Sequence, residues 1–300
     1  MDYTVNTDSK GLRLDVFAAE RTGLTRSRVK TLIGGGAVAV NGKAVKGGFI
    51  LRAGDIVSAE IPAAPAPAKL APEDIPFTIV YEDGDLAVID KPRGLTVHPA
   101  GGKYTGTLVN ALLFRLKNLS GINGEIRPGI VHRLDKMTSG LMAVAKNDAA
   151  HLSLSRQIAE KTAERIYRGI VEGVVKEDGG VIDQPLGRDA KDRKKIAVRA
   201  GGRRAVTRWR VVKRFKQNTL VEFKLETGRT HQIRVHCRFM GYPIVGDKEY
   251  GFKKQRFNLP GQMLHACRLS FNHPATGERM TFQAELPEDF RDVLKKLKDG

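Results

Sequence analysis

Three features are scarce in this 300-residue sequence: cysteines, acidic residues and long apolar runs. The two cysteines, Cys237 and Cys267, are too few for a disulfide framework or an all-protein zinc site, and we expect both to be buried thiols. No apolar run approaches the roughly 20 residues of a membrane-spanning helix. No charged-then-apolar signal segment opens the chain. We therefore expect a cytoplasmic protein with no membrane partner.

Motifs for the common cofactors are missing as well. The sequence contains no HExxH, no closely spaced set of His and Asp residues, no Walker loop and no GxGxxG after a predicted strand. We therefore expect chemistry that needs neither a metal nor a cofactor.

The shortage of acidic residues makes the chain strongly basic. Thirty-three Asp and Glu residues face 51 Lys and Arg residues, which gives a formal net charge of +18. Such an excess favours a polyanionic partner, because Lys and Arg bind phosphates without regard to sequence. Nucleic acid is favoured over a membrane surface.

Residues 1–61 have the pattern of a small basic module. Apolar spacing predicts a helix that reaches Glu20 and a second helix from Ser27 that ends at Gly34–Gly36. A strand at 37–40, the turn pair Asn41-Gly42 and a returning strand at 55–57 then predict a hairpin. Several basic residues share this unit, with a solvated helix face as the alternative interpretation; they are Arg13, Arg21, Arg26, Arg28, Lys30, Lys43 and Lys46.

Residues 62–72 are rich in Pro and Ala and predict a semi-extended linker. The larger domain is expected at 73–300. Its many short strands and few helices predict an α+β fold with a mixed, largely antiparallel sheet. The expected strands are 78–81, 86–89, 141–145, 166–171, 207–211, 220–227 and 264–271, and the expected helices are 108–114, 149–161, one after Gly228 and one after Pro287.

The loop at 129–141 carries the strongest chemical signal. Asp135 lies between Arg133 and Lys136, just before an apolar strand, and both cations favour an ionised carboxylate suited to act as a base or nucleophile. The alternative is that Asp135 only caps a turn or pairs with Arg133.

This loop resembles the signature loop of the RluA-type pseudouridine synthases, through His132, Arg133, Leu134, Asp135, Thr138, Ser139 and Gly140. Further segments resemble other motifs of that family, and the best likeness is to the C and D types that act on the large ribosomal subunit; these segments are 91–95, 97–99, 106–113, 166–171, 228–236 and 264–274. The N-terminal module resembles the alpha-L RNA-binding module through Arg13-Leu14-Asp15, Ser27-Arg28, Val40-Asn41-Gly42-Lys43 and Gly54-Asp55.

The resemblance implies conversion of uridine to pseudouridine in RNA by a cofactor-free enzyme with a long bent sheet and a central cleft. It implies that Asp135 is the essential carboxylate, that Arg229 pairs with it and that Tyr167 packs against the base. It further implies that the target base is flipped out, that Arg133 fills the vacancy, and that His132 and Leu264 contact the substrate. The route, covalent or by elimination, is left open.

A dense basic stretch at 188–216 predicts an arm or loop that contacts phosphates, with a solvated loop as the alternative. The candidate contacts to the RNA backbone are Lys194, Lys195, Arg203 and Arg204 here, and Arg13, Arg26, Arg28 and Lys30 in the N-terminal module. The alternation of residues 207–211 predicts that Trp209 packs in the core rather than stacking on RNA bases. His98 is interpreted as a hydrogen-bonded loop histidine, with substrate contact as the alternative.

Two other functions compete with this one. A catalytically silent RNA-binding or ribosome-assembly protein would use the same basic surface. A glycoside or N-glycosyl hydrolase would need a second carboxylate, and none pairs convincingly with Asp135 in the sequence. We expect a monomer that acts on RNA of the large ribosomal subunit, with transfer RNA left open as a target.

Overall fold

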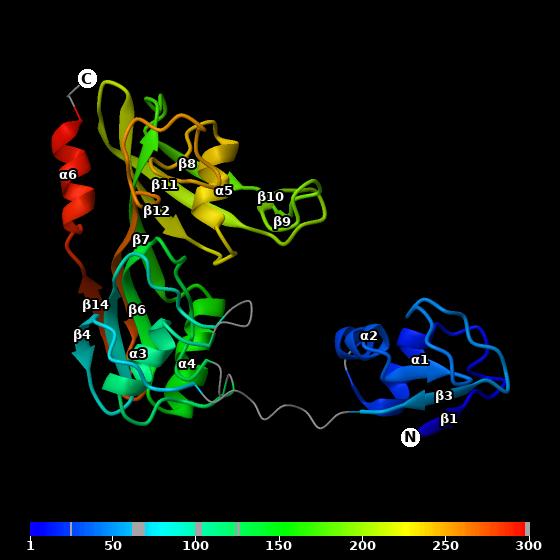
Figure 1. The fold of residues 1–300 in the computed structure, drawn as a ribbon. Coiled ribbons are helices and arrows are strands. Elements are labelled where there is room, and N and C mark those ends of the chain that lie inside the picture. Colours follow the sequence, from blue (N-terminus) through cyan, green and yellow to red (C-terminus); the bar gives the residue numbers. More distant parts are fainter. Residues whose placement is uncertain (25, 62–69, 100–103, 123, 125–126, 298–300) are drawn as a thin grey trace. The chain divides into compact units, whose positions relative to one another are not determined.

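A computed structural model describes residues 1–24, 26–61, 70–99, 104–122, 124 and 127–297, without the side chains of Ser27 and Arg28. The chain divides into two compact units, 1–67 and 68–300 (Figure 1). Most of the predicted linker, residues 62–69, lies outside the described ranges, and Leu70 beyond it is packed in the core of the second unit. Within the described ranges, no helix has the length and apolarity needed to cross a membrane.

The first unit is a three-stranded antiparallel sheet with two helices. Its elements are β1 (Asp2–Thr4), α1 (Leu14–Thr22), α2 (Arg26–Gly34), β2 (Val38–Val40) and β3 (Ile56–Ala59), with the strand order β1-β3-β2. Asn41 and Gly42 turn the chain after β2 with φ angles of 49° and 73°, the left-handed conformations that such a two-residue turn requires. Strand β1 was not predicted, because three residues show no usable alternation.

The second unit is built on a nine-stranded sheet in the order β4-β5-β6-β13-β7-β12-β11-β8, with β14 paired to β13. Among the described strands, β6 and β13 run parallel and the other neighbours in this sheet are antiparallel, which confirms the predicted mixed α+β fold. Its strands are β4 (Thr78–Glu82), β5 (Leu86–Lys91), β6 (Ser139–Ala145), β7 (Glu164–Glu172), β8 (Gly179–Asp183), β11 (Val206–Arg214), β12 (Asn218–Leu225), β13 (Leu264–Asn272) and β14 (Arg279–Gln283).

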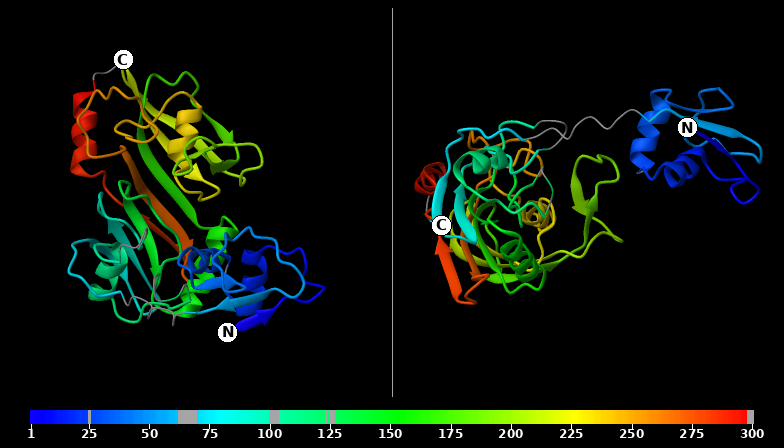
Figure 2. Two further views of the ribbon diagram at one scale, coloured as in Figure 1. Left: turned by 45° about the vertical axis from the view of Figure 1, so that its right-hand side comes forward. Right: turned by 90° about the horizontal axis from the view of Figure 1, so that it is seen from below.

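Helices pack on both faces of this long sheet, which Figures 1 and 2 show from three sides. They are α3 (Leu108–Arg115), α4 (Asp148–Ala159), α5 (Gln232–Phe239) and α6 (Glu288–Lys296). Met142 and Val144 of β6 join a core with α3 and α5, whereas Leu141 and Ala143 join another core with α4. Because side chains of a strand alternate between faces, α3 and α5 share one face of the sheet.

The basic stretch at 188–216 is not a single arm, which corrects the prediction. It comprises a hairpin of β9 (Leu186–Arg188) and β10 (Ile196–Val198) followed by strand β11 of the main sheet. Cations on β11 pair with acids on β12 or just after it: Arg210 with Glu222 of β12 at 2.6 Å, and Arg208 with Glu226 at 2.5 Å. The sequence count overlooked these acids because they pair across the sheet rather than along the chain.

The other predicted strands and helices are found to within a few residues. Strands β8 and β14, and the hairpin strands β9 and β10, were not predicted. Trp209 is half-buried and packs against the main core, as predicted. Cys237 is buried and Cys267 is half-buried, and both are free thiols.

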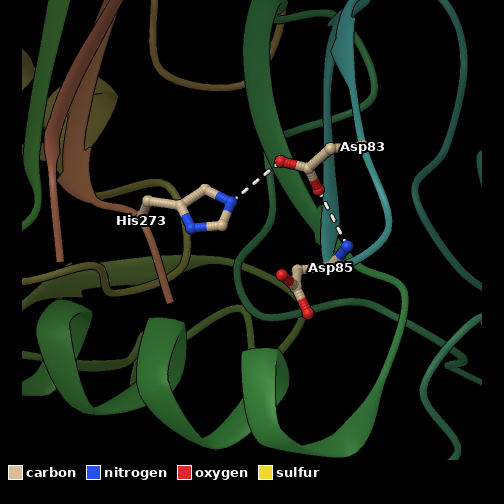
Figure 3. Close-up of side chains that lie close together, drawn as sticks. All are labelled: Asp83, Asp85 and His273. Atoms are coloured by element: carbon tan, nitrogen blue, oxygen red, sulfur yellow. Dashed lines mark hydrogen bonds and ion pairs between the residues drawn. The ribbon is translucent and has the colours of Figure 1, made fainter. Parts of the chain in front are cut away.

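Asp83, Asp85 and His273 form a polar clip between the β4–β5 turn and the end of β13 (Figure 3). His273 Nδ1 accepts two backbone N–H groups, so its Nε2 carries the proton and donates to Asp83 Oδ2 at 2.8 Å. The other oxygen of Asp83 accepts the backbone N–H of Asp85 at 2.8 Å and that of Leu86 at 2.9 Å. Although these side chains lie close enough to suggest a metal site, the contacts explain the cluster as a structural clip.

The clip predicts an acid-sensitive contribution to stability. Burial raises the pKa of Asp83, but hydrogen bonds from Tyr81, from two backbone N–H groups and from His273 lower it more, to about 2. The contribution is therefore complete above the unfolded-state pKa of about 3.9 and is lost as the pH falls through about 2. We expect Asp83→Asn to lose on the order of 1 kcal/mol at neutral pH, and this difference to shrink in acid.

Urea unfolding of the wild type and Asp83→Asn at a series of pH values measures this difference. Asp85→Asn removes the same charge, but among the described residues the Asp85 side chain accepts a hydrogen bond from Asn147 alone, so this variant is the control with a smaller loss. A difference for Asp83→Asn that is independent of pH would show that packing, rather than the carboxylate charge, stabilises the turn.

Candidate active site

Three neighbouring strands bring distant parts of the sequence to one point. The loop that carries Asp135 leads into β6, where Ser139 lies opposite His265 of β13. On the other side of β13, Ala266 lies opposite Tyr167 of β7. Asp135, Tyr167 and Leu264, the first residue of β13, consequently line one cavity.

Glycine allows the close approach of β6 to β13 beside this loop. Gly140 has a φ of +116°, and a Cβ on it would lie 2.3 Å from the carbonyl oxygen of Ala266. Any larger residue would push the strands apart. Next to it, the Ser139 hydroxyl and His265 Nδ1 are hydrogen-bonded at 3.0 Å.

The segment at 91–95 fixes the backbone of the Asp135 loop from behind. Lys91, fully buried, donates from Nζ to the carbonyls of Pro92 at 2.8 Å, Leu95 at 2.9 Å and Lys136 at 3.2 Å. Arg93 donates to the Met137 carbonyl, and its Nε reaches Asp289 of α6 at 2.7 Å. Two buried cations therefore hold consecutive carbonyls just after Asp135, which restricts where its carboxylate can point.

The Asp135 carboxylate is held by a buried arginine of α5. Arg234 Nη1 lies 3.1 Å from Asp135 Oδ2, and the Asp135 side chain remains 17% exposed. The same guanidinium binds Asp247 at 2.7 Å and Glu249 at 3.1 Å, so three carboxylates surround it. Burial raises the pKa of Asp247, but its contacts with Arg234 lower it more, to below the ordinary value. A charged hydrogen bond of this kind keeps the Asp135 carboxylate oriented.

The prediction that Arg229 forms this ion pair is wrong. Arg229 precedes α5, and its Nε donates to the carbonyl of Arg204 at 3.0 Å. Arg234 lies in the first turn of α5 and reaches Asp135 instead. Both arginines line the cavity.

His231 is a second neighbour of Asp135. It begins α5 in the left-handed conformation, with a φ of 56°, which is uncommon outside glycine. Its Nε2 lies 3.9 Å from Asp135 Oδ1, and its Nδ1 is hydrogen-bonded to the Tyr250 hydroxyl at 2.8 Å. That hydroxyl accepts the Ile196 backbone N–H at 3.0 Å, which links hairpin strand β10 to the Asp135 site.

The cavity has a volume of about 440 Å³ and contains the other predicted site residues. Tyr167 is buried in its wall, and this burial raises the pKa of its hydroxyl, with Asp135 adding to the effect. His132 accepts the Ala143 backbone N–H on Nε2 at 3.0 Å. Burial and the nearby Arg165 lower the pKa of His132 to about 3, so its ring is neutral near pH 7.

Arg133 lies at the exposed side of the cavity. Its Nη1 donates to His98 Nε2 at 3.3 Å, and burial, Arg133 and Arg127 lower the pKa of His98 to about 4. His98 is thus the hydrogen-bonded loop histidine that we predicted, and it helps to position Arg133.

The candidate RNA-backbone residues fall into two groups. In the first unit, Arg13, Arg26 and Lys30 lie 3.0, 3.2 and 3.5 Å from the fully buried carboxylate of Asp15, while about half of each cation remains exposed. The side chain of Arg28 lies outside the described part of the structure. One buried acid thus gathers three cations on the module surface.

In the second unit, Lys194 and Arg203 are exposed, whereas Arg204 lines the 440 Å³ cavity. Lys195 lines a second cavity of about 390 Å³ that also touches Asp135. Of these residues, Arg204 and Lys195 thus share a cavity wall with Asp135.

Sequence reasoning missed Arg234 as the partner of Asp135, and also missed Arg165 and Tyr250. Arg165 precedes Tyr167 by two residues on β7, a spacing that places both on one face of the strand and could have revealed it. Tyr250 gave no such signal, because its role depends on contacts with distant segments.

A basic module is thus combined with a sheet domain whose cavity holds the oriented carboxylate of Asp135, an arrangement suited to an enzyme that acts on RNA. A family model described as RNA pseudouridylate synthase matches residues 85–239, and an S4 domain model matches residues 12–57. The chain belongs to the RNA pseudouridine synthase family and carries an N-terminal S4 domain, which confirms the predicted resemblance.

Several curated proteins are similar over nearly the whole chain. The uncharacterized RNA pseudouridine synthase YlyB of Bacillus subtilis is 48% identical, over 99% of this chain and 98% of its own length. The ribosomal large subunit pseudouridine synthase D of Zymomonas mobilis is 44% identical, over 98% of this chain and 96% of its own length. A solved structure of human RNA pseudouridylate synthase domain containing 1 shares the fold, with a TM-score of 0.58 and 23% identity over 78% of this chain and 97% of its own.

The geometry predicts that Arg234 and Arg229 contribute very differently to stability. Arg234→Gln leaves the buried carboxylate of Asp247 without its ion pair, which should cost about 3–5 kcal/mol of unfolding free energy. Arg229→Gln is the matched control and should change stability by less than about 0.5 kcal/mol. Urea unfolding of both variants measures this difference, and equal losses would contradict the assignment of the ion pair to Arg234.

Proposed function

We propose that this enzyme converts uridine to pseudouridine in large-subunit ribosomal RNA, with Asp135 as the essential carboxylate. One observation carries the proposal: the carboxylate of Asp135 is held by Arg234 at the wall of a cavity that Tyr167 and Leu264 also line. The cavity offers the side chains of Tyr167 and Leu264 to a base and the oriented carboxylate of Asp135 to its ribose.

The reaction begins with extrusion of the target nucleotide from its stack. Arg133, on the exposed side of the cavity, fills the vacated space, and the base enters beside Tyr167 and Leu264. His132 is neutral and contributes a contact to the substrate without adding a charge.

The chemical step exchanges one bond for another. Asp135 acts as nucleophile or base at the ribose, the N1–C1′ bond breaks, and its electron pair remains with the uracil. The uracil turns, C5 bonds to C1′, the C5 proton leaves and N1 gains a proton. The balance involves neither an oxidant nor a lost group, in keeping with a reaction that needs no cofactor.

Basic residues on both units supply the affinity for the RNA backbone. The cations around Asp15 remain about half exposed, and Lys195 lines the second cavity beside Asp135. We assign phosphate contacts to these residues and to Arg203, Arg204 and Lys194. Arg229, which does not bind Asp135, is placed to join them at the wall of the cavity.

A hydrolase is less well supported, because such enzymes use two carboxylates at the sugar bond. Asp247 and Glu249 are the acids that share Arg234 with Asp135, and its guanidinium already binds both of them. Neither is placed as a free proton donor. Glu226 also lines the cavity, but it pairs with Arg208 at 2.5 Å and lies 3.7 Å from Lys161. The relatives named as synthases of the large ribosomal subunit favour that RNA over transfer RNA.

The proposal predicts that Asp135→Asn abolishes pseudouridine formation while the RNA is still bound. The amide keeps the shape of the side chain but lacks the negative charge, so we expect a rate at least about 10³-fold lower. Wild type and variant would be incubated with total RNA from source cells that lack the gene, and pseudouridine would be mapped by position.

Asp178→Asn is the matched control, because that carboxylate is 94% exposed and pairs with Arg214 at the surface. It should modify the same uridines as wild type. Product confined to transfer RNA would overturn the ribosomal target. Salt-sensitive binding without product would support the silent RNA-binding protein, and release of free uracil would support the hydrolase.

A further inference from the structure

The cavity contains a second buried arginine that the site described so far does not use. Arg165 of β7 is only 6% exposed, yet its Nε has no hydrogen-bond partner among the residues the structure describes. No ion pair to its guanidinium is present in those ranges either, in contrast to Arg234 with its three carboxylates. A buried cation without a partner is costly, so its retention in a cavity points to a ligand that completes it.

The surroundings of Arg165 place its guanidinium beside the proposed base site. Arg165 and Tyr167 are two residues apart on β7, so their side chains lie on one face of the strand, and both line the 440 Å³ cavity. The absence of a side chain at Gly228 makes room for the guanidinium, since a Cβ there would lie 2.9 Å from Arg165 Nη1. The cation therefore occupies a space that the fold leaves open for it.

We propose that Arg165 is a catalytic residue that donates hydrogen bonds to a carbonyl oxygen of the target uracil and stabilises the charge it gains. This inference rests on the proposed function. When the N1–C1′ bond breaks, the electron pair stays on the uracil and spreads onto its carbonyl oxygens. A guanidinium that is already fixed and shielded from water stabilises such an anion more than water would. The charge disappears once C5 has bonded to C1′ and the displaced protons have been exchanged.

The identity of the ligand follows from donor and acceptor chemistry. Uracil presents carbonyl oxygens, which are acceptors, whereas arginine presents only donors in a rigid fork. The buried position beside Tyr167 favours the base over a backbone phosphate, for which the exposed cations of the site are better placed.

The first test compares Arg165→Met with Arg168→Met, a control on the same strand. Arg168 lies outside the cavity and pairs with Glu222 at 2.8 Å. We expect Arg165→Met to lower kcat for the mapped uridine by about 10²–10³-fold with KM changed by less than about threefold. Arg165→Lys keeps the charge but not the forked guanidinium, so its kcat should lie between those of wild type and Arg165→Met. Arg168→Met should retain the kcat of wild type.

Urea unfolding separates this role from a structural one. Removing a buried cation that has no partner should leave the unfolding midpoint of Arg165→Met unchanged or higher. A lower midpoint together with the loss of kcat would show that Arg165 supports the fold and would overturn the proposal. A kcat within about threefold of wild type would overturn it as well.

A substrate substitution tests the contact itself. RNA carrying 2-thiouridine or 4-thiouridine at the target position replaces one carbonyl oxygen by sulfur, a poorer acceptor. Wild type should be slowed at the oxygen that Arg165 contacts, and Arg165→Met should show no such slowing. Equal thio effects in both enzymes would overturn the inference alone, whereas a wild type that makes no pseudouridine from unmodified RNA would overturn the proposed function.

Discussion

The ionic contacts of Arg234 are the interaction on which the Asp135 site depends. Arg234 lies among Asp135, Asp247 and Glu249, and its guanidinium binds all three carboxylates. Asp247 binds the guanidinium through two oxygens and is itself fixed by backbone N–H groups, which orients the arginine. Asp135 binds the remaining nitrogen, so its carboxylate is oriented by an arginine 99 positions away along the chain.

The arrangement of the strands brings the segments of this site together. Strands β6, β13 and β7 are neighbours, and the close approach at Gly140 places the start of β13 directly beside the loop that carries Asp135. Lys91 and Arg93 then bind the carbonyls of Lys136 and Met137, and Arg93 also ties this loop to α6 through Asp289. A parallel pair inside an otherwise antiparallel sheet is what joins segments so distant in sequence at one cavity.

Sequence patterns were sufficient to predict most helices and strands and the loop that carries Asp135. They did not predict which residues pair with Asp135 or with the cations of β11. Alternation and helical spacing predicted β12 and α4, and the family resemblance located Asp135, Tyr167 and Leu264 at one site, where the structure also places them. The choice between Arg229 and Arg234 failed because both lie in one motif, and only the start of α5 at Gln232 decides which side chain turns toward Asp135. Likewise, Glu222 of β12 and Glu226 just after it pair with cations of β11, and only the register of the sheet could reveal these pairs.

The two buried arginines of the cavity show how the site divides its charges. Arg234 is saturated by carboxylates, so it fixes the ground state of Asp135 and has little left to offer a substrate. Arg165 has no such partner among the described residues and shares its strand face with Tyr167. In the proposed reaction, Asp135 supplies negative charge at the ribose, whereas Arg165 supplies positive charge where the base becomes negative. A site with charges placed in this way at the two ends of the N1–C1′ bond would stabilise the transition state in which that bond breaks. Each fixed charge is then opposite in sign to the charge that develops on the nearby part of the substrate.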